Sequence, residues 1–212
     1  AFPKEENEAK ETAFQNLRPA GKRNAVPGKQ PRTGIPDGAP IFPQKPVTDR
    51  ERSYGTGGNI LIRFVTDGEE KSKIAEKILG DLPEWFGLPD STAEYVRESG
   101  KMPFWAYCEN GAAVGFIALK ETSPYTAEIY VMGVRKTFHR RGIGRELFRA
   151  FYGYAKKHGY EFLQVKTVDA GHYEGYDRTR MFYEKMGFRK LETFPTLWDE
   201  WNPCLVMVMA VR

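Results

Sequence analysis

A basic turn with two glycines is the part of this sequence best suited to bind an anion. Residues 139–144 read His-Arg-Arg-Gly-Ile-Gly, and they open a strongly amphipathic helical stretch. The first N–H groups of a helix have no partner within the helix and carry a partial positive charge, so they stabilise an anion. Glycines in such a turn leave room for a diphosphate to approach these amides. The residues expected to form the anion site are His139, Arg140, Arg141, Gly142, Ile143, Gly144 and Arg145.

A glycine pair at a helix start is weak evidence by itself, because a purely structural turn has the same sequence. The segment does not fit G-x-x-x-x-G-K-[ST], since no Lys-Ser or Lys-Thr pair follows, and it lacks the full G-x-G-x-x-G spacing. The chain has three histidines and two cysteines, which argues against a zinc cluster. Cys108 and Cys204 lie in apolar runs, so we expect reduced core residues and no metal site.

The elements that position this turn alternate between strands and helices from residue 59 onward. Apolar β-branched runs predict strands, apolar residues at helical spacing predict helices, and Asn110-Gly111 predicts a hairpin turn. The resulting order is β-α-α-β-β-β-α-β-α-β-β, which predicts one mixed α/β or α+β domain. Strands are expected at 59–66, 103–110, 112–121, 126–134, 160–168, 188–195 and 204–211, and helices at 69–82, 90–99, 144–159 and 177–187.

Residues 1–58 differ in composition from the rest. Residues 18–46 contain seven prolines and four glycines, which prevents a continuous helix. The first 58 residues hold ten Lys and Arg against seven Asp and Glu, whereas residues 59–212 hold 22 against 21. We therefore predict a basic, Pro- and Gly-rich extension over 1–58 and a folded domain over 59–212. The extension is either a flexible tail or a segment held by its own domain or by a protein or RNA partner.

Two features bear on the compartment. No run approaches the roughly 18 apolar residues that a membrane-spanning helix needs, so we expect no integral membrane protein. No charged and then apolar leader opens the chain, which begins at Ala1. We expect a cytoplasmic protein, or one of an organelle matrix if Ala1 is a processed terminus.

Two spaced motifs make the sequence resemble the GNAT superfamily of acetyl-CoA-dependent N-acetyltransferases. The family signature Q/R-x-x-G-x-G/A corresponds to residues 139–144, with His139 in the Q/R position. The second signature, Y-x-K-x-G-F at the end of a helix, is intact at residues 183–188. The resemblance covers residues 59–212, including the order of elements. It implies a mixed, mostly antiparallel central sheet with flanking helices, splayed between the fourth and fifth strands.

The resemblance also implies how acetyl-CoA is bound. In the family the pantetheine arm lies in the splay and pairs with backbone groups of the fourth strand, which correspond here to Met132, Gly133 and Val134. Gly133 is expected either as a bulge residue or as a simple packing accommodation. The pyrophosphate would contact the amides of residues 140–145.

Two residues are expected to carry proton transfers. Glu128 lies eleven residues before His139, the spacing of the catalytic glutamate in the histone-acetyltransferase branch of the family. Alternation would place residues 128, 130 and 132 on one strand face, and apolar neighbours would favour a partly desolvated base. The alternatives are a Glu paired with a neighbouring Lys, or deprotonation through water. Tyr183 matches the family tyrosine that protonates the departing thiolate; the alternative is a core aromatic.

The acceptor pocket is expected near aromatic residues around the first helices, the middle strands and the C-terminal part. These are Trp85, Phe86, Phe104, Trp105, Tyr107, Tyr125, Trp198 and Trp201, with Asp199 and Glu200 as acidic partners. Acidic residues between tryptophans would suit a cationic amine, whereas the alternative is a loop that only caps the sheet.

The sequence thus predicts an enzyme that transfers the acetyl group of acetyl-CoA directly to a primary amine on a small molecule or peptide. The alternative is an accessory or structural subunit of a large assembly, such as a ribonucleoprotein. Such a subunit would keep a CoA-binding fold, and its N-terminal extension would thread a partner. The sequence leaves the acceptor and the oligomeric state open.

Overall fold

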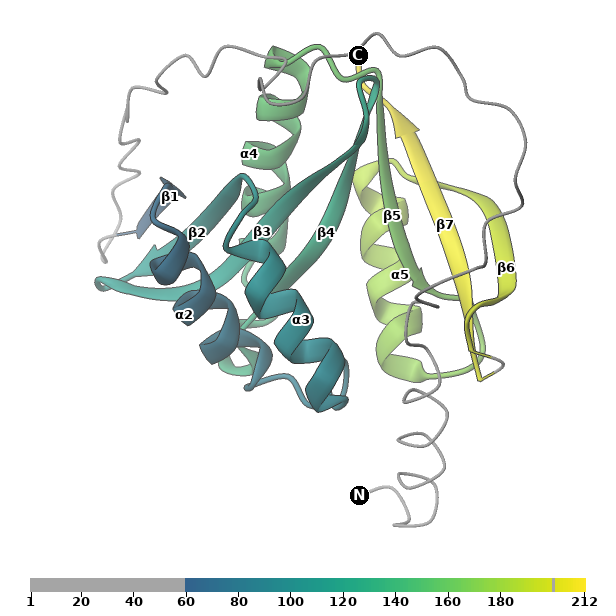
Figure 1. Ribbon diagram of the computed structural model, residues 1–212, viewed down its shortest axis with the longest axis horizontal. Coiled ribbons are helices and arrows are strands. Elements are labelled where there is room, and N and C mark those ends of the chain that lie inside the picture. Colours follow the sequence, from purple (N-terminus) through teal and green to yellow (C-terminus); the bar gives the residue numbers. More distant parts are fainter. Residues whose placement is uncertain (1–59, 200) are drawn as a thin grey trace, which may run out of the picture. The chain divides into compact units, whose positions relative to one another are not determined.

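One seven-stranded sheet organises the residues that the computed structural model describes, 60–199 and 201–212. The strand order is β1-β2-β3-β4-β5-β7-β6, and neighbours are antiparallel except for the parallel pair β4 and β5 (Figure 1). This confirms the predicted mixed, mostly antiparallel sheet. The strands are β1 (Ile60–Val65), β2 (Phe104–Glu109), β3 (Ala112–Ser123), β4 (Thr126–Val134), β5 (Phe162–Val168), β6 (Arg189–Asp199) and β7 (Asn202–Ala210).

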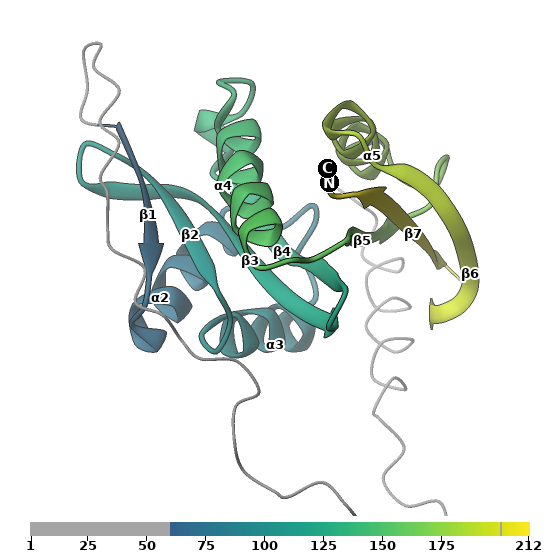
Figure 2. The same ribbon diagram turned by 90° about the horizontal axis from the view of Figure 1, so that it is seen from above.

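Helices cover both faces of the sheet. Figure 2 shows α4 (Ile143–Lys157) and α5 (Glu174–Met186) on one face, and α2 (Gly68–Leu79) and α3 (Pro89–Ser99) on the other. A short 3₁₀ helix, η1 (Lys136–Phe138), links β4 to α4. The element order in the described part of the chain is the order that the sequence predicted.

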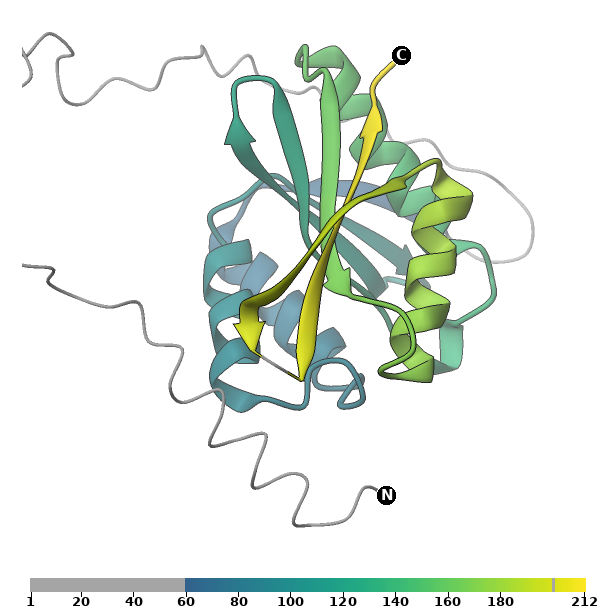
Figure 3. The same ribbon diagram turned by 90° about the vertical axis from the view of Figure 1, so that its right-hand side faces the viewer.

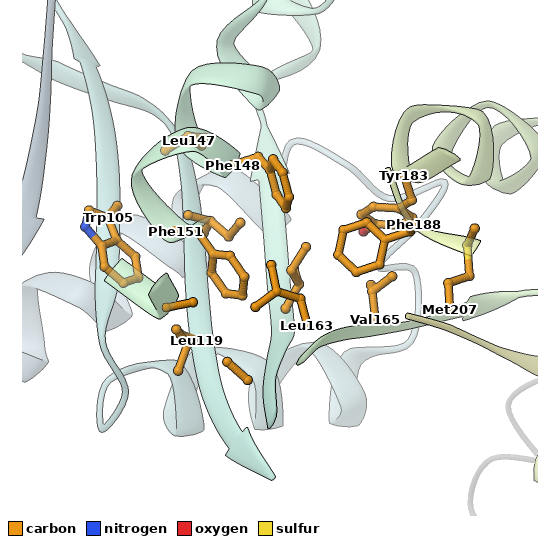
Figure 4. Close-up of a cluster of buried hydrophobic side chains, with 14 of the residues drawn as sticks. Trp105, Leu119, Leu147, Phe148, Phe151, Leu163, Val165, Tyr183, Phe188 and Met207 are labelled. Carbon is orange, nitrogen blue, oxygen red and sulfur yellow. The ribbon is translucent and has the colours of Figure 1, made fainter. Parts of the chain in front are cut away.

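Each face has its own hydrophobic core. The cluster under α4 and α5 includes Phe151, Leu163 and Phe188, all fully buried, and Figure 4 shows it reaching from Trp105 to Met207. The cluster under α2 and α3 includes Ile78 and Phe116. Burial of a large apolar side chain contributes about 1.5–3 kcal/mol, so these two layers hold the helices that carry the site against the sheet.

Local sequence explains several element boundaries. Asp67 begins α2 by accepting a hydrogen bond from the Glu70 N–H at 2.7 Å. Asn110 and Gly111 both have positive φ, 52° and 79°, as a tight hairpin between β2 and β3 requires. Gly187 ends α5 in the left-handed conformation with φ 109°.

The C-terminal strands are longer than predicted. β6 continues through Pro195 to Asp199, and Asp199 pairs with Asn202, so the predicted loop is mostly a hairpin (Figure 3). Because β6 is the outermost strand of the sheet, a proline without a donor is tolerated there.

Some expectations lie outside the described residues. They include the extension over 1–58, the partner-binding role that follows from it, and the side chains of Asp199 and Glu200; these stay predictions. Among the described residues, no helix combines the length and the apolar character needed to cross a membrane.

Candidate active site

The site is built around an opening between β4 and β5. The two strands pair only from Thr126 to Ile129 and from Phe162 to Val165, although β4 runs to Val134 and β5 to Val168. Beyond these pairs the strands part, as Figure 1 shows in its lower half. The backbone edges that face each other across the opening are therefore available to a ligand, and the predicted splay is confirmed.

A bulge in β4 decides which side chains face which helices. Val131 pairs with Ala118 and Ile129 pairs with Leu119, so Tyr130 is an extra residue. Tyr130 and Val131 both pack on the α2 side, whereas Ile129 and Met132 pack on the α4 side. The predicted simple alternation of 128, 130 and 132 on one face is therefore wrong, because one extra residue reverses the phase of the strand.

The predicted bulge at Gly133 is also wrong, since Gly133 pairs regularly with Phe116. A Cβ at Gly133 would lie 3.0 Å from the Ile78 Cγ2 and 3.2 Å from the Leu82 Cδ1. The glycine is a packing accommodation that lets α2 approach the sheet, which was the stated alternative. Its neighbours Met132 and Val134 face the α4 side.

The start of α4 lies at the end of the opening where β4 finishes. Gly142, the N-cap residue, has φ 82°, open space where a Cβ would be, and no side-chain hydrogen bond to the helix. The amides of Ile143 and Gly144 have no acceptor within the helix because of their position in its first turn. Gly144 has a different reason to be glycine: a Cβ there would lie 3.3 Å from the Phe182 ring. The turn therefore offers an uncapped amide cradle of the kind that fits a phosphate.

The basic residues of the turn differ in whether the protein itself engages their side chains. Arg141 donates to the Glu109 carboxylate at 2.8 Å and lies over the Phe138 ring, so its charge is engaged. Arg140 is exposed and itself has positive φ, 63°. The His139 Nε2 lies 2.6 Å from the carbonyl oxygen of Val134, so this histidine braces the end of β4.

An open groove of about 560 Å³ lies between α4 and α5. It is lined by Arg145, Phe148, Arg149, Lys185 and Met186. Three cations beside an aromatic ring and a thioether suit an anionic ligand that also carries a flat apolar group. Apart from Arg145, these residues were missed from the sequence, because the groove joins side chains of two helices that are at least 36 residues apart in the chain.

Glu128 is buried at 6% exposure and is held by two side chains of β5. Its Oε2 accepts from the Gln164 Nε2 at 2.5 Å and from the Lys166 Nζ at 2.6 Å. Burial, as predicted, and pairing with a lysine, the stated alternative, thus occur together. Neither Gln164 nor Lys166 carried a local signal, since both lie more than 30 residues along the chain from Glu128.

Tyr183 is 6% exposed and lies on α5 beside Phe188, on the α4 side of the sheet (Figure 4). Burial raises the pKa of its hydroxyl above the usual value, and the nearby Tyr176 and Tyr95 add to the shift. Tyr95 comes from α3, and burial and then the Glu128 charge raise its pKa. Tyr95 is therefore within electrostatic reach of both predicted catalytic residues.

Three of the predicted acceptor aromatics lie in the core. Tyr125 is exposed in the β3–β4 turn, and its expected role stays a prediction. Phe104, Trp105 and Tyr107 are core residues, so these three expectations were wrong. These three residues are buried because β2 is an inner strand of the sheet, and its side chains are covered on both faces.

Trp85, from the α2–α3 loop, does reach the opening. Its ring lies 6.0 Å from His139 and against Gly175 at the start of α5, and its carbonyl accepts from the Tyr176 hydroxyl at 2.9 Å. The Trp85 Nε1 and the Thr167 Oγ1 are buried polar atoms without a hydrogen-bond partner in the part of the chain that the structure describes. Two such orphaned groups around the opening fit a polar ligand placed between the strands.

Both cysteines are buried and free of disulfides. Cys204 is fully buried on β7, and burial raises its pKa to about 11, so the thiol stays protonated near neutral pH. Within residues 60–199 and 201–212, no group of His, Cys, Asp or Glu is arranged to hold a metal ion.

Comparison with known families accounts for this arrangement. Residues 73–188 match the model of the acetyltransferase (GNAT) family. The chain belongs to the GNAT acetyltransferase family. The first sequence motif, residues 139–144, forms the uncapped turn before α4, and the second, residues 183–188, forms the end of α5.

Two relatives match about half of the chain. An uncharacterised N-acetyltransferase of Bacillus subtilis is 28% identical over 102 residues, 48% of this chain and 66% of the relative. The mycothiol acetyltransferase of Corynebacterium glutamicum is 30% identical over 101 residues, 48% of this chain and 32% of the relative. The matches therefore span less than two thirds of either relative.

Solved structures share the GNAT fold at low identity. A protein from Desulfovibrio desulfuricans assigned to this family has a TM-score of 0.62 at 17% identity, covering 72% of this chain and 99% of that one. A GNAT acetyltransferase of Elizabethkingia anophelis, with acetyl-CoA bound, has a TM-score of 0.56 at 20% identity (72% and 98%). The Escherichia coli ribosomal-protein-S18-alanine N-acetyltransferase has a TM-score of 0.56 at 16% identity (72% and 94%).

Proposed function

We propose that this chain is an N-acetyltransferase that moves the acetyl group of acetyl-CoA directly to a primary amine. The observation that carries the proposal is the opening between β4 and β5, which has an uncapped helix start at its end and a buried carboxylate beside it. Membership of the GNAT family and the acetyl-CoA bound to a structural neighbour support it.

Acetyl-CoA fits the residues present. Its diphosphate would be held by the amides at Gly142, Ile143 and Gly144, with Arg140 contributing charge. Its nucleotide end would occupy the α4–α5 groove. The arm would lie along Met132, Gly133 and Val134, near the orphaned Thr167 hydroxyl. When bound, it supplies an acetyl thioester, and the chain's own groups handle the protons.

Glu128 is the proposed base. It is a buried carboxylate whose attached hydrogen-bond donors, Gln164 and Lys166, fix the position of one of its oxygens. A fixed carboxylate beside the opening can accept the proton of an acceptor ammonium. Tyr183 is the proposed acid, because its raised pKa keeps the hydroxyl protonated across the neutral range, ready to donate to a departing thiolate.

A primary amine is the acceptor that suits a carboxylate base and a tyrosine acid. A carboxylate base on the α3 side gives a cationic amine a counter-charge, and the relatives named above include a ribosomal-protein-alanine N-acetyltransferase. A peptide with N-terminal alanine and a small diamine are therefore the first probes to test. Free thiol released from acetyl-CoA reports turnover with either.

The experiment that tests cofactor binding compares two glycines of the same helix. Gly142→Ala places a Cβ in the open space of the amide turn at a positive φ, whereas Gly153→Ala places one in open space on the helix surface. Acetyl-CoA should raise the melting temperature of the wild type, because at 100 times its Kd it adds about 2.7 kcal/mol to the free energy of unfolding.

The affinity of Gly142→Ala for acetyl-CoA should fall about tenfold, which is about 1.4 kcal/mol of binding free energy. This loss lies within the range by which a helix N-terminus stabilises a negative charge. Gly153→Ala should bind as the wild type does. An unchanged melting temperature in millimolar acetyl-CoA, or equal affinities in both variants, would contradict the proposed binding mode.

A further inference from the structure

A lysine of β5 lies directly beside the proposed base, Glu128. The Lys166 Nζ lies 2.6 Å from the Glu128 Oε2. In the register of the sheet, Glu128 lies opposite Gln164, and the last β4–β5 pair joins Ile129 to Val165. Lys166 is the next residue, so its side chain reaches back to Glu128 from the point where the two strands part.

The Lys166 amine lies in a partly buried environment. The Glu128 side chain is 7% exposed and that of Lys166 is 32% exposed, so the ion pair is mostly shielded from water. The neighbouring Cys204 is fully buried, and burial is the main cause of its raised pKa. The Cys204 thiol therefore stays protonated near neutral pH and does not compete with Lys166 as a nucleophile.

An amine at hydrogen-bond distance from a general base has the arrangement that an acceptor must adopt before it attacks. We propose that Lys166 is a self-acetylation site, modified by the acetyl-CoA bound to its own chain. This inference rests on the proposed function, because it takes Glu128 as the base and the β4–β5 opening as the place of the thioester.

The reaction balances without another reagent. The Lys166 ammonium gives one proton to the Glu128 carboxylate, and the neutral Nζ attacks the thioester carbonyl carbon. The C–N bond forms, the C–S bond breaks, and the thiolate takes a proton, for which Tyr183 is the proposed donor. The attacking nitrogen loses its second proton, which restores the tyrosine hydroxyl, and the proton held by Glu128 passes to solvent. The products are N-acetyl-lysine, free CoA and one proton released to solvent. Acetylation removes the positive charge that faces Glu128.

Lys190 serves as a matched control within the same protein. It lies on β6, pairs with Asp169 at 3.0 Å, and its side chain is 57% exposed. Like Lys166 it is bound to a carboxylate, but it is more accessible to reagents in solution. Acetylation by uncatalysed reaction with acetyl-CoA would therefore favour Lys190 over Lys166.

The experiment incubates the full chain with acetyl-CoA and no added acceptor. Acetylation of each lysine is followed by mass spectrometry of peptides at two protein concentrations. We expect Lys166 to react at least about tenfold faster than Lys190, because proximity raises the effective concentration of the amine. The rate per molecule should not depend on protein concentration, and Glu128→Gln should lower it about 10²-fold. Lys166→Arg keeps the charge and should abolish the fast phase.

Three results would overturn the inference. They are a Lys166 rate no greater than that of Lys190, a rate unaffected by Glu128→Gln, and the same rate in heat-denatured protein. Melting in acetyl-CoA and thiol release with the amine probes are measured on the same sample. If the chain binds acetyl-CoA and turns over an amine while Lys166 stays unmodified, only the self-acetylation fails. If acetyl-CoA does not bind, the proposed function fails with it.

Discussion

Replacing Tyr183 by phenylalanine should separate the chemical role of this residue from its packing role. Its ring contacts Phe182 and Phe188 edge-on, with centroids 5.5 and 5.8 Å apart. Phenylalanine keeps the ring and therefore these contacts. The free energy of unfolding at neutral pH should change by about 1 kcal/mol or less, the usual net effect of one hydroxyl. Binding of acetyl-CoA should be unchanged.

Turnover should fall by about 10² to 10⁴, the usual contribution of a positioned acid. At about 1.36 kcal/mol per factor of ten, this is a loss of roughly 2.7–5.4 kcal/mol of transition-state stabilisation. The loss should not shrink as the amine deprotonates, because a higher pH supplies no proton donor to the departing thiolate. Burial raises the pKa of Tyr183, so the wild-type acid should not ionise below about pH 10.

Glu128→Gln gives the contrasting result. The amide keeps the shape of the side chain but accepts no proton from the amine. Its deficit should shrink as the pH approaches about 10, where a primary amine becomes largely neutral without help. Because this variant also leaves Lys166 without its counter-charge, its thermal melting is measured beside its activity.

The assay is thiol release from acetyl-CoA at saturating amine, followed from about pH 7 to 10, the range over which a primary amine deprotonates. Wild-type turnover by Tyr183→Phe would show that water is the acid and that the tyrosine is a core residue. Equal losses in the two variants at every pH would refute Glu128 as the base.

Three further predictions follow from packing and charge. Gly133→Ala should lower the free energy of unfolding by about 1–3 kcal/mol, because its Cβ would lie 3.0 Å from the Ile78 Cγ2; in urea titrations Gly153→Ala should be neutral or up to about 1 kcal/mol more stable, and equal midpoints would contradict this reasoning. Lys185→Ala should raise the Kd of acetyl-CoA about tenfold by calorimetry, equivalent to about 1.4 kcal/mol; the difference should shrink in high salt, and a salt-independent effect would point to packing instead. Stability should fall as the pH rises above about 10, since the unfolded phenol of Tyr183 then loses a proton that the folded one keeps; Tyr183→Phe should flatten this decline, and an identical slope would place the alkaline sensitivity in other residues.

Features that depend only on neighbouring residues could be predicted from the sequence. The Asn110-Gly111 turn, Gly142 before α4 and Gly187 at the end of α5 each act through local backbone conformation, so their positions can be predicted from the sequence. Hydrophobic periodicity likewise predicted the order of strands and helices. That order, together with the two motifs, gave the family resemblance, and the resemblance implied the splay between β4 and β5.

The directions of the site side chains depend on how distant parts of the chain pack together. The extra residue at Tyr130 arises from how β3 and β4 pair, and it reverses the faces of the residues that follow. The contact of Glu128 with Lys166 joins residues 38 apart, which no local pattern encodes. Trp85 and Trp105 look alike in sequence, yet one borders the opening and the other is buried in the core, because burial depends on which strands and helices surround a residue.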